Sequence, residues 1–135
     1  MKVRPADLDR LARLGAVVGP PPQLPPALDC SEAEFQAWVV RQAQARGWRH
    51  YHTHDSRRSP EGFPDLVMVR DRTVYAELKT TTGVVSQDQR EWLEALEAAG
   101  DEVYLWRPAD WRVVIETLTR RGLTLPLVDQ AGEGS

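Results

Sequence analysis

The stretch Gly62-Phe63-Pro64-Asp65-Leu66-Val67-Met68-Val69, followed by Thr73-Val74-Tyr75-Ala76-Glu77-Leu78-Lys79, decides the fold of this chain. The two apolar runs are joined by a short polar turn, which predicts strands at 66–69 and 74–79 that pair as a hairpin. Because side chains alternate across a strand, Glu77 and Lys79 point to the same face. In such a hairpin, Asp65 can reach that face as well.

Two carboxylates and one ammonium are therefore predicted to converge at an edge of the sheet. Asp65 and Glu77 suit a hard divalent cation, Mg²⁺ or Mn²⁺, with the Leu78 carbonyl as a third ligand. Lys79 would orient an attacking water or stabilise the charge of a phosphate. The alternative interpretation is a surface cluster of salt bridges, which the spacing alone does not distinguish from a metal site.

The segments before and after the hairpin contain further motifs in a fixed order. Ser31-Glu32-Ala33-Glu34-Phe35-Gln36 and Gly47-Trp48 come before the hairpin, and Ser86-Gln87-Asp88-Gln89 follows it at the start of a helix. With Pro64, Asp65, Glu77 and Lys79 in the PD-(D/E)xK positions, the chain resembles the small stand-alone form of the VRR-NUC family over roughly residues 31–118. The resemblance implies an α/β, restriction-endonuclease-like fold, in which helices flank a mixed central sheet. It also implies a metal-dependent DNA endonuclease.

Two further site residues follow from the resemblance. In the family, a glutamate on the first helix approaches the metal, and Glu34 fits that position best, with Glu32 as the alternative. Glu34 also stands three residues after Ser31, so a capping box is an alternative role. Gln89 would hold a water or a phosphate oxygen near the metal, or else only belong to a helix start capped by Ser86.

A basic segment lies between Arg41 and Arg58, where five arginines and all three histidines stand against one acid. Arginine binds phosphate through its planar fork of donors. We therefore predict that the residues of this segment nearest the hairpin contact DNA: His52, His54, Arg57 and Arg58. The histidines at 50, 52 and 54 alternate at strand spacing, so a zinc site and a solvated strand edge are the alternatives.

The expected order of elements is α-β-β-β-α-β-α. Helices are expected near 31–46, 86–98 and 109–120, and strands at 48–53, 66–69, 74–79 and 102–106. In the second helix, Trp92, Leu93 and Leu96 are expected to face inward. The expected organisation is an N-terminal arm with a proline-rich linker (1–30), a nuclease domain (31–120) and a tail (121–135).

Composition narrows the class of protein. A chain of 135 residues that is 41% hydrophobic fits one domain with one core. The single Cys30 excludes an internal disulfide and a cysteine-rich zinc site. No apolar run approaches the ~20 residues that span a membrane. A cytoplasmic protein of a bacterial or phage-infected cell is expected. The net charge of −3 argues against a protein that coats nucleic acid in bulk.

The resemblance also suggests a substrate and an assembly. It implies a homodimer that cuts branched DNA such as four-way (Holliday) junctions, since two symmetric cuts need two active sites. An accessory or non-catalytic nucleic-acid-binding module is the alternative from another class. A nuclease with sequence preference, linked to restriction or to a mobile element, is a third possibility.

Overall fold

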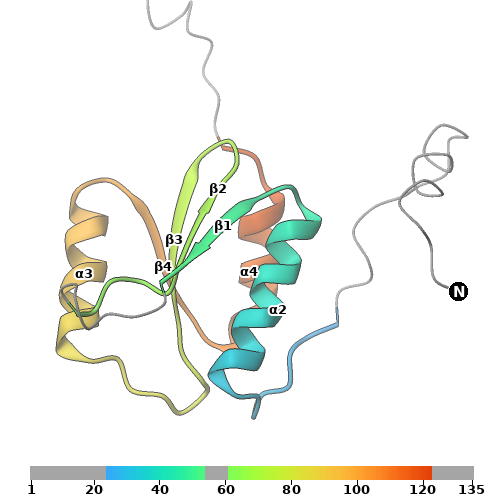
Figure 1. Ribbon diagram of the computed structural model, residues 1–135, viewed down its shortest axis with the longest axis horizontal. Helices are drawn as coiled ribbons and strands as arrows, with labels where there is room; N and C mark the ends of the chain where they lie inside the picture. The colour runs from blue at the N-terminus through green and yellow to red at the C-terminus, as the bar shows by residue number, and fades with distance from the viewer. Residues whose placement is uncertain (1–23, 54–60, 123–135) are drawn as a thin grey trace, which may run out of the picture.

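The computed structural model describes residues 24–53 and 61–122, and its elements follow the predicted order (Figure 1). The described residues form three regular helices and four strands, with one 3₁₀ turn before the last helix. In chain order they are α2 (Glu32–Ala45), β1 (Arg49–His52), β2 (Leu66–Val69), β3 (Thr73–Leu78), α3 (Gln87–Ala98), β4 (Glu102–Trp106), η1 (Pro108–Asp110) and α4 (Trp111–Thr119).

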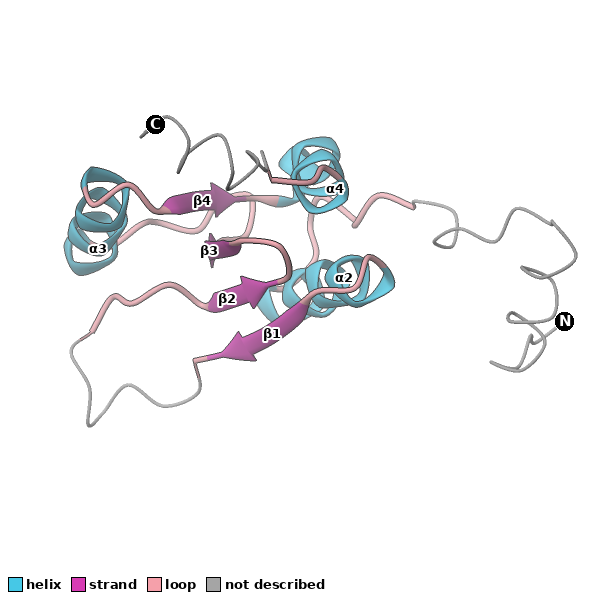
Figure 2. Cartoon of the chain, turned by 90° about the horizontal axis from the view of Figure 1, so that it is seen from above, coloured by secondary structure: helices cyan, strands magenta, loops and turns pink. Residues whose placement is uncertain are grey.

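The four strands form one mixed sheet in the order β1-β2-β3-β4. Both β1 and β3 are antiparallel to β2, whereas β3 and β4 are parallel and connected through α3. Viewed from above, α3 lies on one side of the sheet next to β4, and α2 and α4 lie on the other (Figure 2). This arrangement confirms the predicted α/β fold with a mixed central sheet flanked by helices.

The core lies between the sheet and the pair α2 and α4. Phe35, Trp38 and Val39 of α2 are buried there, as their helical spacing predicts. Alternate positions of the central strands meet them, so their partners are the side chains of Leu66, Met68, Val74, Ala76 and Leu78. Trp106, Val114 and Leu118 complete this layer.

The other face of the sheet is less covered. Trp92, Leu93 and Leu96 of α3 were expected to face inward, but α3 has no fully buried residue and these side chains are half-buried. The reason is the position of α3 beside β4, which leaves the β1 side of this face without a described helix (Figure 2). Tyr51 on β1 and Val69 on β2 are accordingly exposed.

The last predicted helix, 109–120, is divided into η1 and α4. Proline lacks an amide hydrogen and favours a helix start, and here Pro108 begins η1, where the Arg107 amide donates to Asp110 Oδ2 at 2.8 Å. Most of the expected N-terminal arm with its proline-rich linker lies outside the described residues, as does most of the expected tail.

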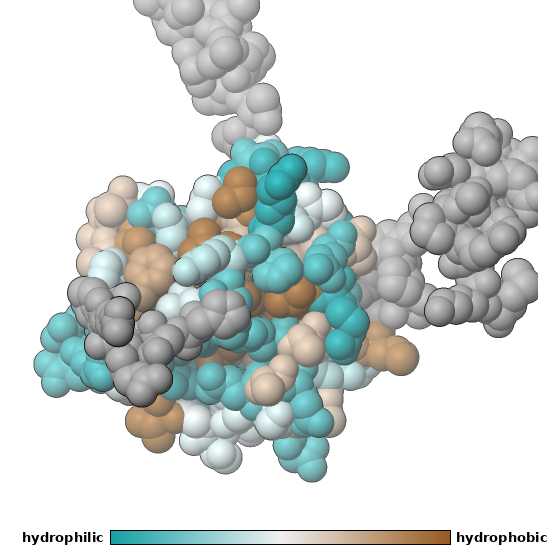
Figure 3. Space-filling view, in the orientation of Figure 1, coloured by the Kyte–Doolittle hydropathy of each residue, from teal (hydrophilic) through white to brown (hydrophobic). Residues whose placement is uncertain are grey.

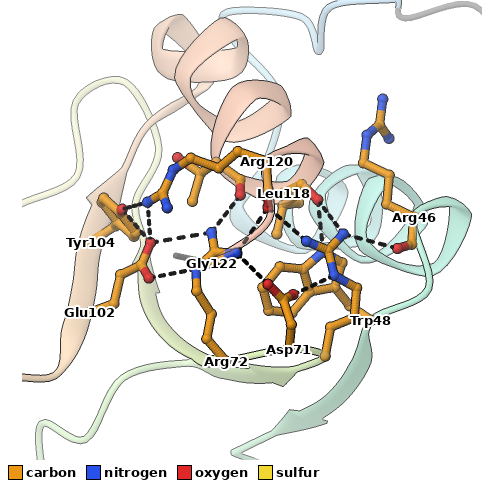
Figure 4. Close-up of polar contacts among 11 residues, drawn as sticks. Arg46, Trp48, Asp71, Arg72, Glu102, Tyr104, Leu118, Arg120 and Gly122 are labelled. Carbon is orange, nitrogen blue, oxygen red and sulfur yellow. Dashed lines mark hydrogen bonds and ion pairs between the residues drawn. The ribbon is translucent and has the colours of Figure 1, made fainter. Parts of the chain in front are cut away.

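A cluster of arginines ties the end of α4 to the turn between β2 and β3 (Figure 4). Arg72 donates to Glu102 Oε1 and to the Thr117 carbonyl, both at 2.7 Å. The Arg70 and Arg72 guanidinium groups also lie 4.5 and 5.1 Å from the centre of the Trp48 ring. These contacts use the last carbonyls of α4, which a helix otherwise leaves without partners. The cluster therefore stabilises the fold at the end of β2 remote from Asp65.

No described helix is long and apolar enough to cross a bilayer. On the face seen in Figure 3, where grey atoms do not cover it, hydrophobic groups lie as separate spots among hydrophilic ones.

Candidate active site at the ends of β2 and β3

The register of the hairpin brings Asp65 and Glu77 together. Leu66 pairs with Ala76, so the next positions outward, Asp65 and Glu77, lie opposite each other across the ladder. Directly opposed side chains in an antiparallel pair have Cβ atoms about 4.5–5.5 Å apart. The predicted convergence of the two acids is thus confirmed, but at the ends of two central strands and not along an edge strand.

Glu77 is an acid held almost wholly out of water, with an exposed fraction of 1%. Its Oε2 accepts from Gln89 Nε2 at 2.8 Å, and its Oε1 has no hydrogen-bond partner among the described residues. Burial, and then the charge of Asp65, raise the pKa of Glu77 from its ordinary value of 4.5 to about 8, against the lowering effect of Lys79. A cation placed beside Glu77 would stabilise the ionised form of this acid.

Asp65 is fixed by the backbone of the opposite strand. Its Oδ2 accepts from the Leu78 amide at 2.9 Å, one residue beyond Glu77. On its other side, the Thr53 amide donates to the Asp65 carbonyl at 3.0 Å, and Pro64 is buried. Because these bonds anchor the residue to both neighbouring strands, the carboxylate of Asp65 stays beside that of Glu77.

Lys79 follows β3 and points back toward the acids. Its Nζ lies 3.8 Å from Glu77 Oε2, and its amide donates to the Trp106 carbonyl at 3.0 Å. The loop after it is held by Arg107, whose Nη1 donates to the carbonyls of Thr80 and Gly83 at 2.6 and 2.7 Å. The sequence interpretation did not include Arg107. Its position directly after β4, the parallel neighbour of β3, is the signal that could have identified it.

Gln89 belongs to the helix start capped by Ser86 and also reaches Glu77, while its holding of a water or a phosphate oxygen near a metal stays a prediction. Its Oε1 accepts from the Ser86 amide at 2.9 Å, and Ser86 Oγ accepts from the Gln89 amide at 3.1 Å, which makes a capping box at the start of α3. Its Nε2 donates to Glu77. The cap therefore fixes the orientation of the amide group that Gln89 presents to the buried acid.

The two acids of α2 are placed differently. Glu34 Oε1 accepts from the Ser31 amide at 2.8 Å, and Ser31 Oγ accepts from the Glu34 amide at 3.1 Å, so Glu34 forms the capping box that was its alternative role. Glu32, the alternative to Glu34, is the acid of α2 whose charge contributes to the raised pKa of Glu77. The charge of Glu32 is the weakest of the named influences on the pKa of Glu77, and Glu34 is not among those influences.

The predicted DNA-contacting residues are only partly described. His50 and His52 share one face, because they pair with Met68 and Leu66 on the α2 side of the sheet. They line a surface groove with Gln36 of α2. Glu77 lies on the opposite face of the sheet. His54, Arg57 and Arg58 lie outside the described residues. The alternative of a zinc site that includes His54 is therefore not tested.

The donor set fits a hard cation that keeps much of its water. Among the described residues, no three His, Cys, Asp or Glu side chains gather closely enough to form a full metal cage. Magnesium is normally bound by one or two protein carboxylates and several waters. Two adjacent carboxylates, one with a buried oxygen that lacks a partner, satisfy that requirement, and Asp65 and Glu77 are the residues that would hold the ion.

The raised pKa of Glu77 predicts an unusual dependence of stability on pH in metal-free protein. Between about pH 4.5 and 8, the unfolded chain has released the Glu77 proton but the folded chain retains it. The free energy of unfolding should therefore fall by roughly a few kcal/mol as pH rises through this window, and then level off. Urea unfolding of the wild type and of Glu77→Gln measures it. The variant should lack this fall, whereas Glu94→Gln, at an exposed site on α3, should keep it. Equal slopes in the wild type and Glu77→Gln would contradict this account.

Comparison with known proteins gives one match. The model of the VRR-NUC domain matches residues 26–109, more than half of the chain, and includes Asp65, Glu77, Lys79 and Gln89. No curated protein and no solved structure matched. The resemblance stated from the motifs is confirmed, and the chain belongs to the VRR-NUC family of nuclease domains.

Proposed function

We propose that this protein is a metal-dependent DNA endonuclease. The observation that carries the proposal is the Asp65–Glu77 pair, in which a buried carboxylate, with one oxygen that has no hydrogen-bond partner among the described residues, stands beside a second carboxylate and an ammonium. Membership of a nuclease family supports the phosphodiester as the bond that is cut.

Each residue has a separate task in this proposal. Asp65, Glu77 and the Leu78 carbonyl hold a magnesium or manganese ion, which supplies an activated water and neutralises phosphate charge. Lys79 orients the attacking water or stabilises charge on the phosphate, from a position fixed by Arg107 through the following loop. Gln89 holds Glu77 Oε2. Contacts of His52, His54, Arg57 and Arg58 with DNA remain part of the proposal.

The direct test is cleavage of labelled DNA by purified protein with different ions. Cleavage is expected with magnesium or manganese, and none with a chelator. Asp65→Asn, Glu77→Gln and Lys79→Ala should each lower the rate on the order of 10²-fold or more, because each removes a preorganised group that stabilises charge. The matched control is Glu94→Gln, which removes an exposed acid from α3 and should keep the wild-type rate. Full activity in the chelator would refute metal dependence.

The two acids of α2 give a second test. Glu32→Gln removes a negative charge that acts on Glu77 and that would also attract the cation, whereas Glu34→Gln keeps a side chain that can still complete the capping box. The rate of cleavage should therefore fall more in Glu32→Gln than in Glu34→Gln. The melting temperatures of the two variants show whether either change acts through the fold. The reverse order of rates, with both variants folded, would restore Glu34 as the acid of the site.

The finer part of the proposal is a homodimer that cuts branched DNA. One domain of 15.3 kDa carries one candidate site, and symmetric cleavage of a junction needs two. Light scattering should give about twice the mass of one chain, and a four-way junction should be cut on two opposed strands, faster than linear duplex. A monomer that cuts linear duplex equally well would leave a general nuclease. DNA binding without cleavage in any divalent ion would favour the accessory binding module.

A further inference from the structure

Gly62 is the point at which the backbone before Asp65 touches the start of α3. Its φ is +98°, in the left-handed region that favours glycine. A Cβ atom at this position would lie 2.5 Å from the Asp88 carbonyl carbon, 2.6 Å from the Asp88 oxygen and 2.8 Å from the Gln89 nitrogen. All three atoms belong to the main chain of the first turn of α3, so no side-chain rotation can make room. The close approach requires glycine.

The next residue extends this contact. The Phe63 ring packs edge-on against Trp92 of α3, with ring centres 5.1 Å apart, and against Tyr75 of β3, with centres 6.1 Å apart. No residue of α3 is fully buried, and Trp92, which Phe63 contacts, is one of its half-buried apolar side chains. Gly62 and Phe63 together form a brace between β3 and α3.

The brace leads directly to the candidate active site. One of the three atoms that a Cβ at Gly62 would meet is the Gln89 amide nitrogen, and the side chain of that residue donates to Glu77 Oε2 at 2.8 Å. The same amide nitrogen donates to Ser86 Oγ in the capping box. A displacement of this turn therefore moves the Gln89 side chain away from the buried acid.

We propose that Gly62 is a positioning residue of the nuclease site, which through its backbone contact with α3 sets the Gln89 amide against Glu77. This inference rests on the proposed function for its effect on cleavage. The predicted displacement of Gln89 is independent of cleavage, so the two can be tested separately.

The chain contains a matched control for the glycine. Gly100, just beyond the other end of α3, has a φ of +92°, but a Cβ there would meet nothing within 4 Å. Gly100→Ala therefore introduces only the backbone strain of a left-handed alanine, whereas Gly62→Ala introduces that strain and the clash with α3. The difference between the two variants isolates the close approach.

The experiment compares Gly62→Ala, Gly100→Ala, Gln89→Ala and the double variant Gly62→Ala/Gln89→Ala. In metal-free protein, the ¹H–¹⁵N signal of the Gln89 side-chain amide should shift in Gly62→Ala and stay in place in Gly100→Ala. In cleavage assays with magnesium, kcat per folded molecule should fall about 100-fold in Gly62→Ala, with a smaller change in KM. A fall of this size is expected when a group of the active site is displaced by about 1 Å. The double variant should be no slower than the slower single variant, because both changes remove the same contact.

An unshifted Gln89 signal in folded Gly62→Ala, or equal kcat in Gly62→Ala and Gly100→Ala, would overturn the proposal. If Gly62→Ala does not fold, the wild type decides instead: nuclear Overhauser contacts should join the α-protons of Gly62 to the backbone amide proton of Gln89, and their absence would overturn the proposal. If the wild type cuts no DNA with any ion, the proposed function fails, while the Gln89 signal still tests the brace.

Discussion

Asp65 and Glu77 lie opposite each other across the β2–β3 ladder, and the site depends on keeping these two acids together while Glu77 is only 1% exposed. Two like charges so close, with one out of water, oppose ionisation, and the pKa of Glu77 rises to about 8. In the metal-free protein, Glu77 therefore keeps its proton at neutral pH, and a divalent cation bound between the two acids would favour its ionised form. Neighbouring contacts are arranged around this pair: Leu78 holds Asp65, and Gln89 holds Glu77.

The two ends of the sheet have different tasks. At the end where β2 stops and β3 begins, arginines bind the last carbonyls of α4 and stack on Trp48. These contacts satisfy groups that the fold would otherwise leave unpaired. At the other end, where β2 begins and β3 stops, Glu77 Oε1 is left without a described partner. Trp106 Nε1, at the same end of the sheet, is the other buried side-chain atom that lacks a partner among the described residues, but it belongs to the core, whereas Glu77 Oε1 lies beside the second carboxylate.

Much of this architecture could be predicted from local patterns. The strands at 66–69 and 102–106 agree with β2 and β4 residue for residue, because short continuous runs of apolar residues marked them clearly. Ser31 predicted the start of α2 through its capping box with Glu34, and Ser86 predicted the start of α3 as its N-cap. The opposition of Asp65 and Glu77 followed from the shortness of the turn, which fixes the register of a hairpin.

The features that could not be predicted from the sequence depend on contacts between segments far apart in the chain, and a local sequence pattern carries no information about such contacts. The spacing of Trp92, Leu93 and Leu96 predicted a buried face, but α3 stands beside β4, where the sheet covers it only partly. The choice between Glu32 and Glu34 depended on which side chain turned back to Ser31. The contact between Gly62 and the Gln89 amide joins residues 27 positions apart, and only the packing of α3 reveals it.

The most direct test of a cation site built on a protonated Glu77 is the number of protons released when metal binds. Calorimetric titration with magnesium or manganese at pH 7, in buffers of different ionisation enthalpy, gives that number. Because the pKa of Glu77 is about 8 in the metal-free protein, binding should release about one proton per ion. The release should disappear in Glu77→Gln. Metal binding with no proton release in the wild type, or no metal binding at all, would contradict the central claim.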